Sequence, residues 1–459
     1  MVAQVAASFL EENTIRNYES EYVLYPWMFQ RGLNPLVVER AKGNYFYDAS
    51  GKQYLDFSSQ FVFSNLGHGD ERMVKAIANQ ASKLEAIASS FGTQPKAHLA
   101  KLLAQITPGD IKKTYFSTSG AEANEGAVKL ARLATGKQKI ISRYIGYHGS
   151  TYGAMALSND YRNWACEPSI PGVSRCLGPY CYRCPFGITY PNCDLQCAKH
   201  LEDIVRFEGG AGRVAAFISE PIVGANGILV PPDGYWSIVR EICNKYEMLL
   251  ICDEIMTGFG RTGEWFAIDH WGVVLDIITM AKGITGGYIP LGATSMRECV
   301  AKQFEDKQWV HGHTYSGHAT AMAAGVAAIG IYKSDGLITR SQELGQYLMQ
   351  KALELKEKHP SIGDVRGKGL FVGLELVKDR KNKEPLHDPW VEGFRPPTAK
   401  IKVVKRMLDD GVYCLPGQTS VIMLAPPLTI TKDEIDYAIN VLDKALLLAD
   451  EEARVWRIF

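Results

Sequence analysis

The fold of this chain is decided by LLICDEIMTGFGRTGEWFA at 249–267 and DIITMAKGITGGYIPLGA at 276–293. Each stretch opens with a short apolar run of strand length and continues into glycines. Asp253 lies near the end of the first run, and Lys282 follows the second. Short apolar runs bounded by glycine or proline are typical of strands that are buried on both faces of a parallel sheet. We therefore expect two strands whose ends carry a carboxylate and an amine.

The same alternation of apolar runs and helical patterns extends in both directions. Helical patterns run over 121–136 and 319–332. Strand-like runs occupy 112–118, 139–144, 215–222, 248–255, 276–281 and 292–296. Strands that alternate with helices indicate an α/β fold with a mostly parallel central sheet.

The flanking parts of the chain follow another pattern. Residues 43–56 predict a β-hairpin with a Ser-Gly turn, and the charged, proline-rich segment 378–397 predicts a long surface loop. The C-terminal part combines helical patterns with strand-like runs, at 334–358, 369–377, 398–410 and 420–426. We predict an N-terminal segment that joins the small domain, a large domain that carries the site, and a smaller α+β domain, at 1–70, 71–332 and 333–459.

Composition excludes several classes of protein. The 459 residues suffice for two or three domains, and 50 Lys and Arg balance 50 Asp and Glu. This balance argues against a surface built for nucleic acid or an anionic membrane. No run of 18 apolar residues occurs, and the N-terminal stretch MVAQVAASFLEEN lacks the basic region of a secretion signal. We expect a soluble, cytoplasmic protein.

Asp253 and Lys282 point to a cofactor when they are taken together. Alone, Asp253 would be interpreted as a helix cap or a core ion pair, and Lys282 as a solvated loop lysine. As a pair at neighbouring strand ends, they provide the two anchors of pyridoxal phosphate (PLP). These are an amine that bonds to the aldehyde and an acid that keeps the ring nitrogen protonated.

Three further segments favour the same cofactor. Ser119, Gly120 and Ala121 lie where a strand gives way to a helix, which suits a phosphate, although such a turn is often only a helix cap. Tyr147 and His148 offer aromatic faces to a ring or simply pack in a loop. Glu220, on an apolar strand before a proline, is either an ion-pair partner or a site residue.

Together with HTYSGHATAMAA at 313–324, these segments resemble the class III aminotransferases, fold-type I PLP enzymes, from about residue 35 to 445. The resemblance implies that Lys282 carries PLP as a Schiff base and moves the substrate proton, and that Asp253 holds the ring nitrogen. It implies that Ile255 and Tyr147 cover the two ring faces. It also assigns the phosphate to the turn at residues 119–121.

The resemblance further implies an oligomer and a reaction. Thr314 matches a residue that reaches the phosphate of the neighbouring subunit, so we expect a homodimer with shared active sites, or a dimer of dimers. Glu220 would lie beside the cofactor and substrate. The expected reaction moves an amino group from an amine or ω-amino acid to a keto acid, with pyruvate preferred. The alternatives are a 2-oxoglutarate-dependent 4-aminobutyrate or taurine aminotransferase, a PLP mutase or decarboxylase, and a non-catalytic metal-binding protein.

The substrate pocket departs from the family pattern. Leu415 stands where many pyruvate-dependent relatives carry an arginine, and leucine cannot bind a carboxylate. Arg162 and Arg395 are candidates for this role, although a surface position is the favoured interpretation of each. Phe61, Phe63 and Phe91 fall in segments that shape the family's pocket.

Cysteines form a second unusual feature. Cys181, Cys184, Cys193 and Cys197 have the spacing C-x2-C-x8-C-x3-C, which allows a zinc site. We favour reduced thiols and no metal, because the x8 and x3 spacings match no common zinc motif. Four other cysteines, Cys243, Cys252, Cys299 and Cys414, are expected to be buried thiols.

Overall fold

A seven-stranded sheet lies at the centre of the computed structural model, which describes residues 10–388 and 398–455. In spatial order its strands are β4 (Ile111–Ser117), β10 (Gly292–Arg297), β9 (Ile277–Met280), β8 (Leu249–Asp253), β7 (Val214–Ser219), β5 (Lys139–Arg143) and β6 (Val173–Cys176). Within this sheet β10 alone runs antiparallel to its neighbours. The predicted α/β fold with a mostly parallel sheet is confirmed.

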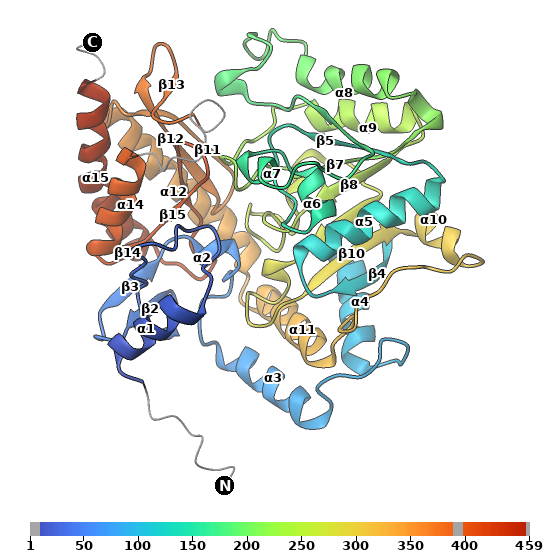
Figure 1. Cartoon of the computed structure of the whole chain (residues 1–459), viewed down its shortest axis with the longest axis horizontal. Coiled ribbons are helices and arrows are strands. Elements are labelled where there is room, and N and C mark those ends of the chain that lie inside the picture. Colours follow the sequence, from blue (N-terminus) through green and yellow to red (C-terminus); the bar gives the residue numbers. More distant parts are fainter. Residues whose placement is uncertain (1–9, 389–397, 456–459) are drawn as a thin grey trace.

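Each face of the sheet has its own core, because successive residues of a strand point to opposite faces. On one face Ile251 of β8 shares a buried cluster with Leu130 of helix α5 (Gly120–Thr135). On the other face Leu250 of β8 shares a cluster with Val239 of helix α9 (Tyr235–Lys245). The helices of this region, which surround the sheet in Figure 1, are α3 (Glu71–Lys83), α4 (Gln94–Ile106), α5 (Gly120–Thr135), α6 (Tyr152–Leu157), α7 (Tyr161–Trp164), α8 (Gln196–Phe207), α9 (Tyr235–Lys245), α10 (Glu298–Ala301) and α11 (Ala319–Ser334).

The C-terminal part forms a second, antiparallel sheet packed with three helices. Its order is β11 (Ile362–Gly367), β12 (Val372–Asp379), β16 (Val421–Leu424) and β15 (Leu415–Pro416), with β13 (Glu384–Pro385) paired to β12. The helices are α12 (Leu337–Lys358), α14 (Thr398–Asp409) and α15 (Lys432–Val455). The predicted loop 378–397 contains β13, and its residues 389–397 lie outside the described part of the chain.

The N-terminal strands join this C-terminal part. The predicted hairpin is present as β2 (Tyr45–Asp48) and β3 (Gln53–Asp56), preceded by β1 (Val38–Lys42). On its other side β3 pairs in parallel with β14 (Val412–Tyr413), so that Leu55 lies opposite Val412. In Figure 1 the blue strands accordingly lie against the red C-terminal helices. This pairing supports the proposed N-terminal segment, while the exact division at residues 70 and 332 stays a prediction.

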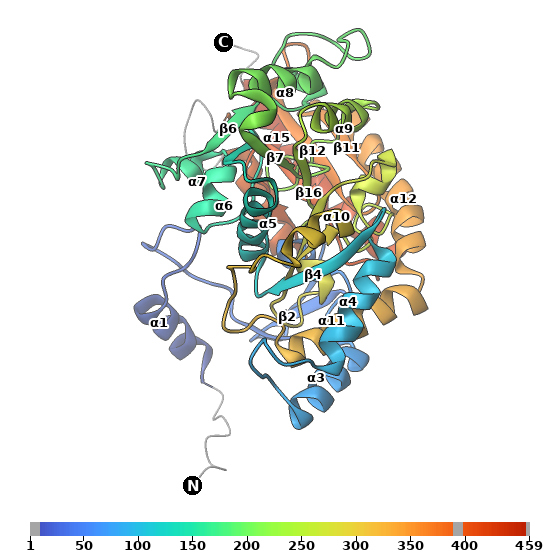
Figure 2. The ribbon, with the colours of Figure 1, turned by 90° about the vertical axis from the view of Figure 1, so that its right-hand side faces the viewer.

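Helix α1 (Glu12–Tyr22) has no buried residue and projects from the body of the molecule in Figure 2. Apolar side chains that follow it are also exposed, including Leu24 at 82% and Phe29 at 67%. Among the described residues, no single helix is long and apolar enough to cross a membrane, and α11 with α12 passes that test only as a pair bent by 62°.

All ten cysteines are free thiols. Cys243, Cys252 and Cys414 are buried as expected. The expectation for Cys299 is wrong, since this residue is exposed. It lies in the short helix α10, which follows the end of β10, and not in the strand itself.

Candidate active site

Most of the residues predicted for the site lie at one edge of the central sheet. Parallel strands end on the same side, so the residues that follow them are brought together. Ser119, Tyr147 with His148, Glu220, Asp253 and Lys282 follow or end β4, β5, β7, β8 and β9, respectively. This edge faces the C-terminal part of the chain in Figure 1.

Asp253 is buried, and three groups hold its carboxylate. Oδ2 lies 2.8 Å from Asn124 Nδ2 and 2.7 Å from His148 Nδ1, while Oδ1 accepts a hydrogen bond from the Ile255 amide at 3.1 Å. Asn124 is itself fixed, because its Oδ1 accepts from the Thr279 hydroxyl at 2.7 Å. The carboxylate therefore has a fixed direction.

Asn124 and Thr279 were not predicted from the sequence. The Asn124 amide donates both to Asp253 and to the backbone carbonyl of His148, at 2.7 Å, and so ties two site segments together. The available signal was an asparagine on the otherwise apolar face of a predicted helix. Such a residue needs a buried hydrogen-bond partner.

Lys282 begins a short 3-10 turn, Lys282–Ile284, with a positive φ of 46°. Burial lowers the pKa of its amine from 10.5 to about 8, although the nearby Asp253 and Glu220 favour the charged form. No described residue accepts a hydrogen bond from its Nζ. A substantial fraction of this amine is thus neutral near physiological pH, and a neutral amine is a nucleophile for an aldehyde.

Glu220 is buried beside this pair. Its Oε1 accepts from the Tyr147 amide at 3.0 Å and its Oε2 from the Gly224 amide at 2.7 Å. Burial raises its pKa, and Asp253 adds to the rise while His148 opposes it. Glu220 therefore fixes the loop that carries Tyr147.

The turn before α5 both caps a helix and presents free amides. Ser119 Oγ accepts from the Glu122 amide at 3.2 Å, as a helix cap does. The Glu122 carboxylate in turn accepts from the amide and hydroxyl of Thr118, at 2.7 and 2.6 Å. The amides of Gly120 and Ala121 lie in the first turn, where helix geometry provides no acceptor. They remain available to an anion.

Ile255 packs directly on this turn. A Cβ placed on Gly120 would lie only 2.8 Å from Ile255 Cδ1. A Cβ on Gly292 of the neighbouring strand β10 would lie 2.2 Å from the Ser119 carbonyl oxygen. Both glycines thus allow a close approach that any larger residue would prevent.

The surface interpretation of Arg162 is wrong, since only 7% of this residue is exposed. Its guanidinium binds Asp160 and lies 3.7 Å from the ring centroid of Tyr147. It is close enough to Lys282 to lower the pKa of that amine slightly. Trp27, which was not predicted, lies over the same group, 5.4 Å from the guanidinium and 6.4 Å from the Tyr147 ring. The aromatic stretch YPWMFQ at 25–30 was the available signal.

The residues predicted for the substrate pocket lie in different environments. Phe63 packs near the lysine turn, because a Cβ on Gly287 would lie 2.3 Å from its ring. Leu415 belongs to the margin of a buried apolar cluster that includes Val62. Phe61 is 55% exposed. Arg395 lies outside the described residues.

Phe91 and Thr314 are both exposed, and no described contact joins either to Lys282 or Asp253. The two segments lie side by side, because the Lys96 ammonium donates to the Phe91 carbonyl at 2.6 Å while its stem packs on Gly317. The described contacts within one chain therefore do not bring Phe91 or Thr314 to the lysine site.

The residues around Lys282 fit PLP. A buried amine with a lowered pKa, a carboxylate fixed at the next strand end and the open amides of a helix N-terminus are the three groups that this cofactor requires. Residues 118–121 of the turn are only partly buried.

Known proteins share this fold and about a third of this sequence. The sequence matches the family described as aminotransferase class-III over residues 28–446. The taurine:2-oxoglutarate aminotransferase of Bifidobacterium kashiwanohense, solved in complex with PLP and glutamate, superposes with a TM-score of 0.92 at 37% identity, over 97% of this chain and 99% of that one. The taurine–pyruvate aminotransferase of Bilophila wadsworthia is 34% identical over 95% of this chain and 97% of its own length. The leucine/methionine racemase of Thermococcus litoralis is 38% identical over 92% of each chain.

The family match covers nearly the entire chain, and the relatives match it over almost their full length. The chain therefore belongs to the class III aminotransferases, enzymes of fold-type I that use PLP to transfer an amino group to a keto acid.

Proposed function

We propose that Lys282 binds PLP covalently, that Asp253 accepts a hydrogen bond from the ring nitrogen, and that the turn at residues 119–121 binds the phosphate. The observation that carries this proposal is the Asp253 carboxylate, which Asn124 and His148 fix at the strand end next to Lys282. When bound, PLP supplies a protonated ring that withdraws the electron pair left by the departing substrate proton.

The residues of the chain then have separate tasks. The Lys282 amine, with its pKa near 8, takes the substrate proton and returns it, since a base works best when its pKa lies near the operating pH. Asp253 keeps the ring nitrogen protonated by its negative charge. Tyr147 and Ile255 confine the ring from its two faces, while Glu220 holds the Tyr147 loop in place.

We further propose that Arg162 binds the carboxylate of the substrate in place of the arginine that Leu415 replaces. Asp160 occupies its Nε and Nη2, and no described residue accepts a hydrogen bond from its Nη1. One buried guanidinium suits a keto acid with a single carboxylate, so pyruvate is the preferred acceptor. Taurine, other ω-amino acids and amines are the proposed donors.

The enzyme is also proposed to be a homodimer with shared sites. Phe91 and Thr314 are exposed on neighbouring segments, and the apolar residues after α1 are exposed as well. These features suit an interface that carries Thr314 to the phosphate of the partner. The cytoplasmic location expected from the sequence remains a prediction.

A panel of donors and acceptors tests the substrate proposal. Taurine, 4-aminobutyrate, β-alanine, alanine and 1-phenylethylamine are each incubated with the PLP-loaded enzyme and either pyruvate or 2-oxoglutarate. We expect bleaching of the visible cofactor absorption by the donor and its recovery with pyruvate. Recovery with 2-oxoglutarate alone would refute the acceptor assignment, and inversion of L-leucine or L-methionine without a keto acid would identify a racemase.

Arg162→Leu tests the carboxylate site. The KM for pyruvate should rise at least tenfold, because a charge-assisted hydrogen bond to a carboxylate contributes about 1.5–3 kcal/mol. The rate of cofactor bleaching by 1-phenylethylamine, which has no carboxylate, serves as the control and should change far less. Equal losses with both substrates would assign Arg162 a structural role instead.

A further inference from the structure

Four cysteines lie in the loop between β6 and α8 and in the first turn of α8, and none of them belongs to the residues assigned to PLP. Cys181 begins the 3-10 turn Cys181–Arg183, and Cys184 directly follows it. Cys193 lies in the turn before α8, and Cys197 lies in the first turn of that helix. The amino-transfer reaction gives these residues no task.

All four thiols line one small cavity. The rest of its lining is largely apolar and aromatic, with Phe186, Ile188, Tyr190 and Pro232 among the contributors. Only about 10 Å³ is open to the centre of a water molecule. This space suits a single small ion or water and excludes an organic ligand.

Two tight turns present the cysteines in pairs. After Cys184, the Gly187 amide donates to the Cys184 carbonyl at 3.0 Å, and Gly187 has a positive φ of 69°. The Gln196 amide donates to the Cys193 carbonyl at 3.1 Å. Cys181 and Cys184 thus come from one turn, and Cys193 and Cys197 flank the start of helix α8.

The thiols lie within electrostatic range of one another. Cys181, Cys184 and Cys193 each interact electrostatically with Cys197. No disulfide links them. Four cysteine sulfurs around a space of this size are a ligand set that zinc binds.

We propose that Cys181, Cys184, Cys193 and Cys197 bind one zinc ion. Each thiol releases its proton to solvent as its sulfur bonds to the metal, and no oxidation is involved. Tetrahedral Zn–S bonds of about 2.3 Å require the four sulfurs to approach one another to roughly 3.8 Å. Over residues 10–388 and 398–455 no three His, Cys, Asp or Glu side chains are already so arranged. Ligation therefore requires side-chain rotation, which the incomplete burial of Cys181, Cys184 and Cys193 permits.

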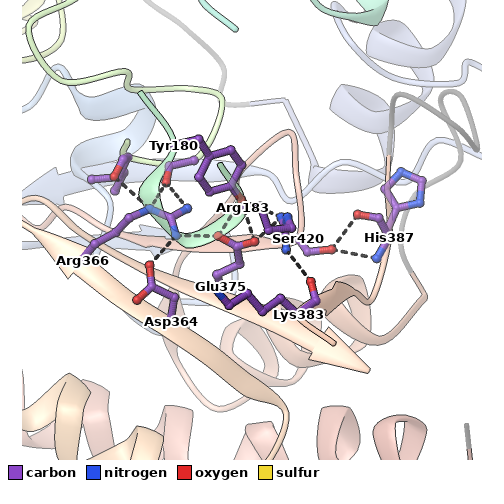
Figure 3. A network of polar contacts seen from close by, with 10 residues as sticks. Tyr180, Arg183, Asp364, Arg366, Glu375, Lys383, His387 and Ser420 are labelled. Atoms are coloured by element: carbon purple, nitrogen blue, oxygen red, sulfur yellow. Dashed lines mark hydrogen bonds and ion pairs between the residues drawn. The ribbon is translucent and has the colours of Figure 1, made fainter. Parts of the chain in front are cut away.

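The zinc site would fix a loop that connects the two parts of the enzyme. Figure 3 shows Tyr180 and Arg183 of this loop meeting Arg366 of β11 and Glu375 of β12. The Tyr180 hydroxyl lies 2.6 and 2.7 Å from the two carboxylate oxygens of Glu375, and Arg183 forms an ion pair with the same carboxylate. Arg366 also donates to the Gly227 carbonyl at 2.6 Å, in the loop after Glu220. Metal at the cysteines thus supports a junction between the C-terminal sheet and the PLP-binding part of the chain.

Metal analysis of the full-length, PLP-loaded enzyme tests the proposal. Purified without chelators and desalted after incubation with zinc, the protein should contain one zinc per chain. The Cys184→Ser/Cys193→Ser variant should contain less than a tenth of that amount. Cys166→Ser and Cys299→Ser, at thiols that do not line the cavity, are the matched controls and should keep the full zinc content.

Wild-type protein gives a second measurement that does not depend on the folding of a variant. An organomercurial titrated into the holoenzyme should release one zinc to a chromogenic chelator as four thiols react. Zinc below a tenth of an equivalent after loading, full zinc in the double variant, or an iron–sulfur cluster in its place would each overturn the proposal. PLP absorption, which does not depend on the cysteines, shows separately whether the amino-transfer site is intact.

Discussion

At Asn124 a single side-chain amide orients two parts of the site. We expect Asn124→Ala to lower kcat roughly 10- to 100-fold, because Asp253 loses a directing hydrogen bond and even a small misplacement of a catalytic group is costly. Thr279→Val, which removes only the partner of Asn124, should have a smaller effect in the same direction. Steady-state kinetics with a saturating donor measures both changes.

Thr114→Val is the control for these variants. It removes a comparable hydrogen bond, 2.7 Å long, between Thr114 and Ser295 on the same sheet but not at Asp253. Its kcat should match that of the wild type. An equal loss in the control would mean that Asn124 supports the sheet in general and has no particular role in orienting Asp253.

The lowered pKa of Lys282 predicts how the apoprotein captures PLP. Because only the neutral amine attacks the aldehyde, the rate constant should rise about tenfold per pH unit below pH 8 and level off above it. A lysine with the ordinary pKa of 10.5 would instead give a rate that keeps rising to pH 10. Stopped-flow absorbance distinguishes the two profiles, and Lys282→Ala should show no covalent capture.

The sequence revealed the site residues that directly follow strands, and it missed those that depend on tertiary packing. Asp253 and Lys282 are recognisable because glycines and apolar runs mark the strand ends. The burial of Arg162 depends on Trp27 and Tyr147, which come from distant segments. No local pattern reports such a contact, so a surface position was predicted for this arginine.

Two glycines of helix α11 should respond in opposite ways to replacement by alanine. A Cβ on Gly325 would lie 2.7 Å from Leu99 Cδ2 of α4, whereas a Cβ on Gly330 meets nothing within 4 Å. Gly325→Ala should therefore lower the free energy of unfolding by about 1–3 kcal/mol through overpacking. Gly330→Ala should raise it by about 0.5–1 kcal/mol, because alanine loses less backbone freedom. Denaturant unfolding of both variants measures these changes. Equal changes in the free energy of unfolding would contradict the packing of α11 on α4.

Arg261 joins the segment after β8 to the N- and C-terminal parts. Its guanidinium donates to the Leu370 and Pro426 carbonyls and to the side chains of Ser59 and Asn65, at 2.5–3.0 Å. Arg261→Lys should lower the free energy of unfolding by about 2–4 kcal/mol, since one ammonium cannot reach all four acceptors and unpaired buried groups are costly.

Arg406→Lys is the matched exchange at an exposed site. Arg406 pairs with Asp410 on the surface, where such pairs contribute at most about 1 kcal/mol. Its unfolding midpoint in urea should stay close to that of the wild type. If Arg261→Lys also left the free energy of unfolding unchanged, the buried hydrogen bonds of Arg261 would not hold the N- and C-terminal parts to the segment after β8.

Among the strands of the two main sheets, β4, β5, β7, β8, β9 and β10 were predicted from the sequence, whereas β6 and β11 were not. β8 (LLICD) and β9 (IITM) are largely apolar and were expected. β6 consists of VSRC and β11 of IGDVRG. Polar residues interrupt both strands, so a search for apolar runs does not find them. They become strands through pairing with β5 and β12. Pairing of this kind is a property of the folded chain and leaves little trace in the local sequence.

For the whole molecule, mixing two inactive variants tests the shared site. In a dimer built from Lys282→Ala and Thr314→Glu chains, the site with an intact Lys282 receives its Thr314 from the other chain. Random refolding of equal amounts makes half of the dimers mixed, so about a quarter of wild-type activity should return. Each variant refolded alone is the control and should stay inactive. No recovery in the mixture would mean that Thr314 acts within its own chain or not at all.

Pairing of β3 with β14 also has a consequence for how the protein is made. Leu55 leaves the ribosome 357 residues before Val412, its partner in the sheet. Until then one edge of the N-terminal sheet remains unpaired, and open strand edges are sites of association between chains. Contacts between distant parts of a sequence also form slowly. Newly made chains therefore carry an exposed edge through most of synthesis, and chains that end before residue 412 never cover it.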